Sequence, residues 1–393
     1  MESQRQKKNK EKFEIIAKTF YGFEDTLSNE INQLGGEIIE KANRAVIFKG
    51  DTQMLYSANY FLRTALSILK PISKFEANDE NELYKKAYEI KWEDFFNIKN
   101  TFSVETTVNS SVFRHSQYAG LKIKDAIVDR FRSKFNKRPF IDTENPDILI
   151  NLHISERKIT ISFNSSGEPL FKRGYRIAAT EAPLNEVLAA GLVMLSGWDK
   201  RVPLIDPMCG SGTILIEAAL IAMNIPPGII RKKFGFESWP DFDQKLFDKI
   251  TKEESNDSNN QEKIKLIGID INKNAIIKAK KNVSNIFLSN YINLINDDFF
   301  NYQNNFSNGI IIVNPPYGIR IGKENINDFY KEIGNKLKRN FVGFDAWIIS
   351  ANLEAIKRIG LHPSKKIKLY NGSQLCLFNK YEIYNDSKKQ KLK

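Results

Sequence analysis

The stretch Asp206-Pro-Met-Cys-Gly-Ser-Gly-Thr213 joins a short apolar segment, 202–205, to a longer one, 213–223. The first segment has the length and composition of a buried strand, and the second those of a helix. Gly210 and Gly212 allow the backbone to turn sharply between them and to come close to a ligand. The first turn of the helix then offers free N–H groups to an electron-rich partner. The stretch therefore predicts a ligand-binding strand–turn–helix unit.

Several nucleotide ligands bind at turns of this kind, and the residues here favour one of them. A phosphate-binding P-loop needs a lysine that is missing, and a dinucleotide fold needs glycine where Leu215 stands. An acid at the strand end suits the ammonium group of S-adenosylmethionine better than a pyrophosphate. We therefore expect this cofactor to contact Asp206, Pro207, Gly210, Gly212 and Thr213. The alternative is a glycine-rich turn without a ligand.

Strands and helices alternate regularly after residue 185. The sequence predicts strands at 202–205, 264–269, 292–295, 309–313 and 345–350, helices at 185–195, 213–223, 273–284, 327–339 and 352–358, and a closing β pair at 367–370 and 374–381. This order, with continuously apolar strands, is typical of a parallel, doubly wound α/β sheet of the Rossmann-like kind. In such sheets ligands bind beyond the carboxyl ends of the strands.

Two further acidic positions follow predicted strands. Asp270 ends the strand at 264–269, where its carboxylate can accept hydrogen bonds from both ribose hydroxyls of a nucleoside; the alternative is that it only caps the next helix. Asp297-Asp298-Phe299 follows the next strand, and either Asp297 or Asp298 can hold an adenine amino group while Phe299 packs on the ring. The alternative for these three is a charged loop.

The motif Asn314-Pro-Pro-Tyr317 follows the strand at 309–313 and indicates the reaction. Pro315 and Pro316 stiffen the backbone and remove N–H donors, so acceptors face the pocket. The Asn314 side-chain carbonyl and the Pro315 backbone carbonyl can both accept hydrogen bonds from one planar amino group. Tyr317 can stack on an extruded base. Positioning this amine against an electrophilic methyl group needs no basic side chain, so we expect these four residues to be catalytic.

The chain before about residue 165 mixes α and β elements. The pattern predicts strands at 13–18, 45–49 and 101–108, a hairpin at 148–153 and 158–163, and helices at 22–34, 52–66 and 122–135. The boundary to the second domain falls within 164–184, and the polar segment 251–262 is predicted to be a solvated insertion. Basic residues crowd the third helix and its exit: Lys122, Lys124, Arg130, Arg132, Lys134, Lys137 and Arg138, with Phe131 and Phe135 between them. We interpret them as RNA-phosphate ligands; the alternative is a solvated helix face.

Composition narrows the class of protein. Lys and Arg number 59 against 47 Asp and Glu, a net charge of +12, and the pI is about 9.3, which favours an anionic partner such as nucleic acid or instead reflects a Lys-, Asn- and Ile-rich genome. There is no transmembrane run and no secretory signal. The two cysteines and three histidines have no metal-ligand spacing. These features predict a cytoplasmic protein without a metal and without membrane association.

The motifs together resemble class I methyltransferases that act on exocyclic amines, and the chain from about 13 to 383 resembles the bacterial THUMP-domain enzymes typified by RlmL. Matching segments are Gly22-Phe-Glu-Asp, Asn59-Tyr-Phe-Leu-Arg-Thr-Ala65, Lys124-Asp-Ala-Ile-Val-Asp129, Lys172-Arg-Gly-Tyr-Arg176, Ala182-Pro-Leu-Asn-Glu186 and Lys368-Leu-Tyr-Asn-Gly372. The resemblance implies a ferredoxin-like and THUMP RNA-binding region at 13–165, a methyltransferase domain at 166–383, and basic tails at 1–12 and 384–393. It also implies that Pro183 and Leu184 lie near the methionine part of the cofactor.

The resemblance further implies methylation of guanine N2 in 23S rRNA. The archetype carries a second methyltransferase half, and because this sequence stops at 393 we expect that second activity to be missing. Three alternatives stay open: a tRNA guanine-N2 methyltransferase, a DNA adenine-N6 methyltransferase, and a catalytically silent RNA-binding factor. The short sequence after 381 argues against a DNA target-recognition region, and the intact Asp206, Asp270 and Asn314 argue against a silent factor.

Overall fold

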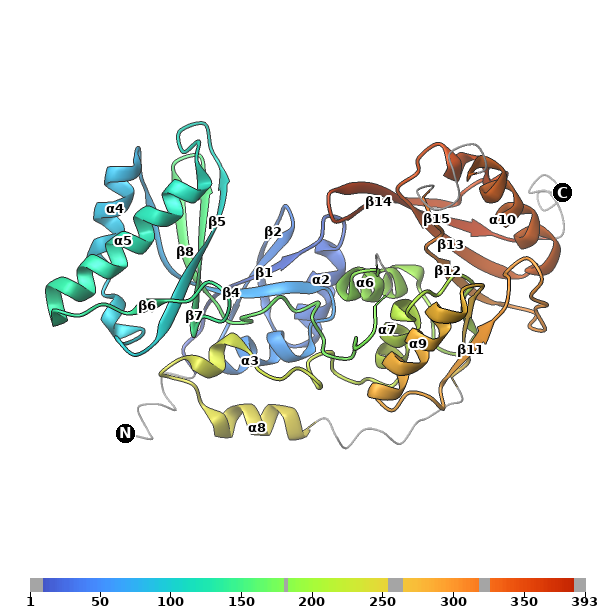
Figure 1. The fold of residues 1–393 in the computed structure, drawn as a ribbon, viewed down its shortest axis with the longest axis horizontal. Coiled ribbons are helices and arrows are strands. Elements are labelled where there is room, and N and C mark those ends of the chain that lie inside the picture. Colours follow the sequence, from blue (N-terminus) through green and yellow to red (C-terminus); the bar gives the residue numbers. More distant parts are fainter. Residues whose placement is uncertain (1–9, 180–182, 254–263, 318–325, 385–393) are drawn as a thin grey trace. The chain divides into compact units, whose positions relative to one another are not determined.

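The computed structural model describes residues 10–179, 183–253, 264–317 and 326–384, and its contacts divide the chain into two units (Figure 1). The first unit contains 1–19, 28–170 and 231–254, and the second contains 20–27, 171–230 and 255–393. This division differs from the predicted boundary at 165/166 in three segments. Residues 166–170 and 231–253 belong to the first unit, and residues 20–27 belong to the second.

The first unit is built on one eight-stranded sheet. Its elements are β1 (Phe13–Thr19), β2 (Glu37–Ala42), β3 (Ala45–Gly50), α3 (Thr52–Phe61), β4 (Ala65–Glu76), α4 (Glu80–Glu89), η1 (Trp92–Asp94), β5 (Thr101–Asn109), α5 (Ser116–Phe135), β6 (Phe140–Ile141), β7 (Ile148–Ser155), β8 (Lys158–Asn164), η2 (Gly235–Ser238) and α8 (Gln244–Glu253). The boundary between the units passes through α2 (Glu24–Gln33). The strand order is β2-β3-β1-β4-β8-β7-β5-β6.

The long strand β4 joins the two halves of this sheet (Figure 1). Its first residues pair with β1, from Ala65 to Leu69, and its remainder pairs with β8 as far as Glu76. The pairing register shifts between Pro71 and Ser73, where proline cannot donate a backbone hydrogen bond. A single strand thus makes one continuous sheet of two αβ segments.

Prediction in this unit fails mainly at short apolar runs. The predicted helix 52–66 ends at Phe61, and Ala65 already begins β4, because an apolar run of this length fits a strand as well as a helix. The strands β2 and β4 and the helices α4 and α8 have no counterpart in the prediction. The hairpin of β7 and β8 is confirmed.

The second unit is a seven-stranded sheet covered on both faces. Its elements are α6 (Glu186–Ser196), β9 (Leu204–Asp206), α7 (Thr213–Ala222), β10 (Leu266–Asp270), α9 (Lys273–Asn285), β11 (Ile292–Asn296), β12 (Gly309–Val313), α10 (Ile326–Asn340), β13 (Phe344–Ser350), η4 (Ala355–Ile359), β14 (Lys365–Asn371) and β15 (Gln374–Glu382). The strand order is β11-β10-β9-β12-β13-β15-β14. The predicted α/β arrangement is confirmed, although the segment predicted as a helix at 352–358 is the 3₁₀ turn η4.

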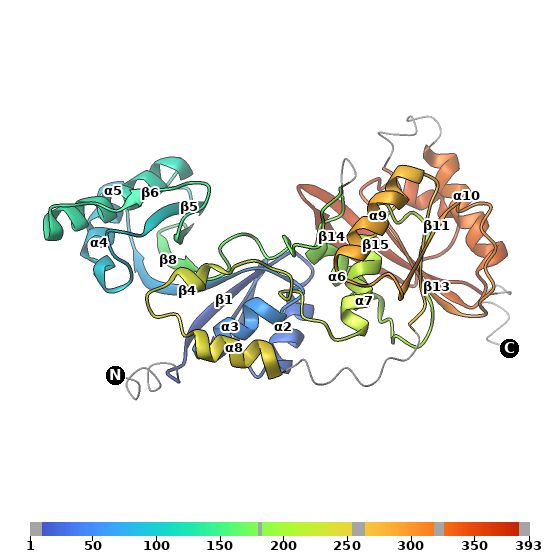
Figure 2. The same cartoon turned by 60° about the horizontal axis from the view of Figure 1, so that its bottom comes forward.

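Two apolar layers hold this sheet. Residues of α6, α7 and α9, among them Leu188, Ile214 and Ile276, pack on one face. Residues of α10 and η4, among them Leu337 and Ile356, pack on the other face (Figure 2). The five strands from β11 to β13 run parallel, and β15 and β14 add an antiparallel edge. The reversal of strand order lies between β9 and its neighbours β10 and β12, so ligands are expected at the carboxyl ends of these strands.

Candidate cofactor and amine-binding site

The glycine turn after β9 has the geometry that its sequence requires. Gly210 and Gly212 have φ values of +54° and +83°, in the region that favours glycine, and Gly212 caps the N-terminus of α7. The Gly210 N–H donates to Oδ2 of Asp270 at 2.8 Å. The Cys209 N–H donates to the Ile269 carbonyl at 2.9 Å. The end of β10 therefore holds the turn that follows β9.

The carboxylate of Asp206 is buried in surroundings that favour a bound cation. Only 2% of the residue is exposed, and its Oδ1 accepts a hydrogen bond from the Met208 N–H at 3.2 Å. Burial, with a smaller effect of the nearby Asp270 carboxylate, raises the pKa of Asp206 to about 8. A buried acid of this kind is stabilised in its ionised form by a cation placed against it. This is the chemistry that an ammonium group would satisfy.

Asp270 is not the cap of the following helix. Asn272 caps α9, with its Oδ1 accepting from the Asn274 and Ala275 N–H groups, whereas Asp270 Oδ1 accepts from the Asn272 N–H at 2.8 Å. Each oxygen of Asp270 accepts one backbone hydrogen bond and retains a further lone pair for a ligand. The structure thus excludes the helix-cap alternative.

The loop after β11 places one aromatic ring in the core. The Phe299 ring is only 4% exposed and packs against Phe300 and Phe341, and its contact with adenine stays a prediction. Asp298 Oδ1 accepts from the Phe300 N–H at 2.9 Å, and Asp297 Oδ1 accepts from the Asp298 N–H at 2.8 Å. Both aspartates stay half-buried and therefore within reach of a ligand.

A buried lysine that the sequence reasoning missed orients the same loop. Lys336, on α10, is 7% exposed and donates to the carbonyls of Phe300 at 2.9 Å and Tyr302 at 2.7 Å. Burial lowers the pKa of its ammonium, and the Asp297 and Asp298 carboxylates oppose that shift. A lone lysine in a polar helix sequence gives no signal that it will be buried.

The Asn314-Pro-Pro-Tyr317 motif begins where β12 ends. Because β12 pairs in parallel with β9, Asn314 lies at the same sheet edge as Asp206. The Tyr317 hydroxyl donates to the Asn314 Oδ1 at 2.5 Å, and Asn352 Nδ2 donates to the Tyr317 carbonyl at 3.2 Å. Burial raises the pKa of Tyr317, which keeps its phenol a donor. The carbonyls of Pro315 and Pro316 lie in the same turn, and residues 318–325 fall outside the described part of the chain.

The basic cluster of α5 divides into two groups. Arg130 makes a two-pronged contact with Glu93, with Nη2 and Nε at 2.7 and 2.8 Å from its oxygens, and Lys134 Nζ lies 2.8 Å from the same carboxylate. Arg130 and Lys134 are therefore both partnered by Glu93 in the fold, and their contact with RNA phosphates stays a prediction. The other group lines a cavity of about 460 Å³: Lys122, Lys124, Arg132 and Arg138, together with Tyr84, Asp125, Val128, Asp129 and Ile141.

Within the described ranges, no helix is long and apolar enough to cross a membrane. In the same part of the chain, no cluster of three acidic, histidine or cysteine side chains is placed to hold a metal ion.

The doubly wound sheet, its glycine turn and the motif after β12 define a class I methyltransferase unit. The chain belongs to the family described as RMKL-like methyltransferases, whose domain matches residues 173–380. A THUMP domain matches 77–164, and the RlmL ferredoxin-like domain matches 14–69. The family resemblance and the fold class that the sequence predicts are thereby confirmed.

Proteins with similar sequences align with nearly all of this chain. A Synechocystis protein named as an RNA methyltransferase is 36% identical over 92% of this chain and 95% of its own. The ribosomal RNA large subunit methyltransferase K/L of Shewanella amazonensis is 35% identical over 95% of this chain, which spans only 54% of that protein. A crystal structure described as a methyltransferase complexed with S-adenosylhomocysteine superposes with a TM-score of 0.86 at 29% identity, covering 96% of this chain and 100% of that one.

Proposed function

We propose that the protein transfers a methyl group from S-adenosylmethionine to the exocyclic N2 amine of a guanine in RNA, with 23S rRNA as the substrate. The observation that carries the reaction type is the placement of Asn314 and Asp206 at the ends of two neighbouring parallel strands. An RNA substrate is supported by the THUMP match and by the names of the relatives. Since ribosomal RNA is a cytoplasmic substrate, we infer that the enzyme acts in the cytoplasm.

The cofactor site is proposed to use both sides of the glycine turn. S-adenosylmethionine, when bound, supplies an electrophilic methyl group. Asp206 would accept hydrogen bonds from the ammonium group, the backbone at Gly210 and Gly212 would face the methionine part, and Asp270 would accept from the ribose hydroxyls. Pro207, Thr213, Pro183 and Leu184 would complete the wall around the methionine part. Asp297 or Asp298 would accept from the adenine amino group.

The amine site is proposed to act by positioning. The Asn314 side-chain carbonyl and the Pro315 carbonyl would accept the two protons of the guanine amino group, which directs the nitrogen lone pair to the methyl carbon. For this, the Tyr317 hydroxyl would release Asn314 Oδ1, and the ring would then stack on the extruded base. The C–N bond forms as the S–C bond breaks, and the amine loses one proton to solvent. S-adenosylhomocysteine and N2-methylguanine are the products.

The cavity beside α5 is proposed to hold RNA phosphates. Lys122, Lys124, Arg132 and Arg138 bring four cations to one cavity, against the two carboxylates of Asp125 and Asp129. The Asp129 carboxylate already accepts from the Tyr84 hydroxyl at 2.9 Å and lies 3.4 Å from Arg132. The excess cations favour a polyanion at this cavity. Lys137, also predicted as a ligand, is exposed at the exit of the helix.

The test offers labelled S-adenosylmethionine and the purified protein to protein-free 23S rRNA, tRNA and duplex DNA, with Asn314→Ala as the matched control. The proposal expects label in 23S rRNA with the native protein and none above background with the variant. Label in tRNA alone would identify tRNA as the substrate and leave the proposed reaction unchanged. Label only in DNA, or in no nucleic acid, would overturn the proposal.

A further inference from the structure

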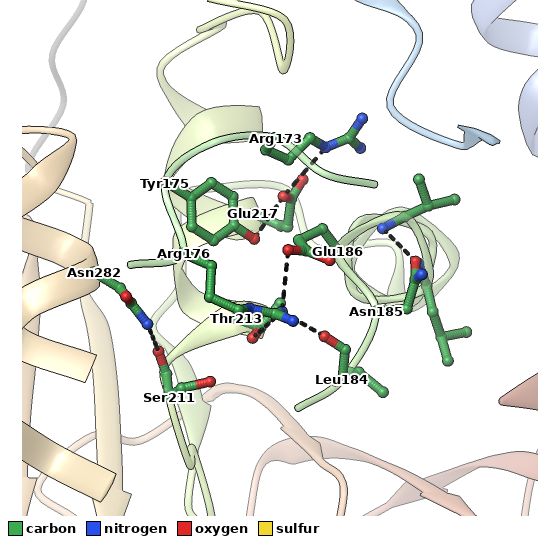
Figure 3. Close-up of polar contacts among 12 residues, drawn as sticks. Arg173, Tyr175, Arg176, Leu184, Asn185, Glu186, Ser211, Thr213, Glu217 and Asn282 are labelled. Atoms are coloured by element: carbon green, nitrogen blue, oxygen red, sulfur yellow. Dashed lines mark hydrogen bonds and ion pairs between the residues drawn. The ribbon is translucent and has the colours of Figure 1, made fainter. Parts of the chain in front are cut away.

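A largely buried polar network, to which no role has been assigned so far, surrounds Arg176. Its residues come from the segment 173–178, from the start of α6 and from α7, all within the second unit (Figure 3). Glu217, on α7, is fully buried and accepts a hydrogen bond from the Tyr175 hydroxyl at 2.9 Å. Arg173 lies with its Nε 3.6 Å from the same carboxylate. The guanidinium of Arg176 occupies the part of this network nearest the glycine turn.

One nitrogen of Arg176 contacts the beginnings of two helices. Its Nη2 donates to the Leu184 carbonyl at 2.6 Å and to the Thr213 hydroxyl at 3.0 Å. Leu184 precedes Asn185, the residue that caps α6, and Thr213 follows Gly212, the residue that caps α7. Figure 3 shows the guanidinium directed between these two groups. Arg176 therefore ties the 183–184 loop to the end of the glycine turn.

The geometry differs from that of a simple ion pair. The Glu186 Oε1 lies 3.4 Å from Nη2, farther than either neutral acceptor, and the pair is not two-pronged. The carboxylate is 5% exposed and compensates the guanidinium charge. Burial raises the pKa of Glu186 to about 7, although Arg176 opposes this shift. The short contacts thus go to the loop and to α7, as expected for a clamp.

A second tie fixes the same segment on its other side. Asn282, on α9, is 1% exposed, and its Oδ1 accepts from the N–H groups of Ile177 and Ala178 at 3.0 Å. Its Nδ2 donates to the Ala178 carbonyl at 2.8 Å and to the Ser211 carbonyl at 3.1 Å. Because Ser211 lies between the two glycines of the turn, the segment 176–178 is fastened to the turn at two points.

We propose that Arg176 is a positioning residue for the cofactor, because it holds the Pro183–Leu184 loop at a fixed place against the N-terminus of α7. This inference rests on the cofactor site proposed above, in which the loop and the glycine turn both surround the methionine part of the cofactor. A pocket whose walls are fixed before binding loses less freedom when the ligand enters, so its affinity is higher. The chemical step does not involve Arg176.

The test removes the clamp without leaving a buried charge. The double variant Arg176→Met with Glu186→Gln removes both charges, Arg176→Lys retains a charge and one donor, and Tyr175→Phe is the control that changes the same network at Glu217. We expect the double variant to weaken S-adenosylhomocysteine binding at least tenfold, to raise KM for the cofactor by a similar factor, and to change kcat less than threefold. Arg176→Lys should recover part of the affinity, and Tyr175→Phe should keep it within threefold.

Amide hydrogen exchange supplies a readout that is independent of activity and of cofactor binding. Exchange in the 183–188 segment should be at least tenfold faster in the double variant than in the Tyr175→Phe protein, measured well below both unfolding temperatures. Unchanged exchange there, or unchanged cofactor affinity in the double variant, would overturn the inference. Native protein that fails to bind the cofactor at all would instead overturn the proposed function, and the exchange comparison would still test the clamp.

Discussion

The glycine turn at 206–213 and the basic helix α5 both carry obvious sequence signals, but their side chains have different surroundings in the structure. At the turn, the backbone geometry comes from the glycines of the motif itself, and Asp270, the acid of a second predicted motif, holds the Gly210 N–H. On α5, two of the basic side chains, Arg130 and Lys134, contact Glu93, which lies 37 and 41 residues before them. The residues of the turn therefore serve one local structure, whereas the basic cluster combines side chains that stabilise the fold with side chains that line a cavity.

The difference reflects what each signal depends on. A positive φ and a helix start are dictated by neighbours in sequence, so glycine and threonine at fixed offsets suffice to predict them. A charge cluster shows only that cations are close in sequence, and long-range ion pairing decides which of them stay available. Motifs that specify backbone geometry can thus be interpreted more directly than charge counts.

The largest expected effect comes from the motif after β12. Asn314→Ala removes one of two proposed acceptors for the amine, so turnover should fall by roughly 10² or more because the reacting nitrogen is no longer oriented. The affinity for S-adenosylhomocysteine, measured by calorimetry, should stay unchanged. A variant that keeps more than a tenth of the native turnover would remove Asn314 from the catalytic site.

The next largest effect, on cofactor affinity, tests whether Asp270 and the glycine turn bind the cofactor together. Asp270→Ala loses the proposed ribose acceptor and also the contact with Gly210, so cofactor binding should weaken by about 1.5–3 kcal/mol, the cost of losing a hydrogen bond to a charged group. Asp270→Asn keeps an acceptor oxygen and should lie between this variant and the native protein. Equal cofactor affinity in all three proteins would contradict the assignment.

The basic residues in and after α5 should separate into the same two groups in an experiment as they do in the structure. Replacing Lys122, Arg132 and Arg138 by Gln should reduce the slope of log affinity for RNA against log salt by about 2 to 3, because three phosphate contacts are lost. Arg130→Met should lower the unfolding temperature and leave that slope within one of the native value, since it breaks the contact with Glu93. If Arg130→Met reduced the slope and the triple variant did not, the residues lining the cavity would be only a solvated helix face.

The smallest expected effect is the release of a proton when the cofactor binds. With a folded pKa of about 8, Asp206 is mostly protonated at pH 7 without cofactor, and its contribution to stability is fully present below pH 3.8 and is lost as the pH rises from there to 8. A bound ammonium group favours the ionised form, so cofactor binding at pH 7 should release close to one proton. Calorimetry in buffers of different ionisation enthalpy measures this release. Asp206→Asn should release none, and a native protein that releases none would disprove the contact.

The sequence predicts the second unit better than the first. Its strands are continuous apolar runs with a helix after each, so Gly309–Val313 is placed without error and most other bounds are within two or three residues. In the first unit, the run after Phe61 fits a strand and a helix alike, and β4 is identified only by pairing with β1 and β8. Partners distant in sequence supply the missing information.

The same reason separates the site residues that could be predicted from those that could not. Asp206, Gly210 and Gly212 lie in one short motif. Asn282 and Lys336 are buried and contact backbone carbonyls far away in the chain, and nothing in their immediate sequence indicates this; Arg176 contacts the Thr213 hydroxyl, which is also distant in sequence. The ring of Phe299, which the motif position places near the ligand, also packs in the core, a contact that the motif alone does not predict.

Identification of the modified nucleoside tests the central claim most directly. RNA methylated by the purified protein is digested and its nucleosides are separated by mass spectrometry, with the Asn314→Ala protein as the control. The account predicts N2-methylguanosine as the labelled product from 23S rRNA and its absence with the variant. A label on the adenine N6 amine, or N2-methylguanosine formed equally well by the variant, would contradict it.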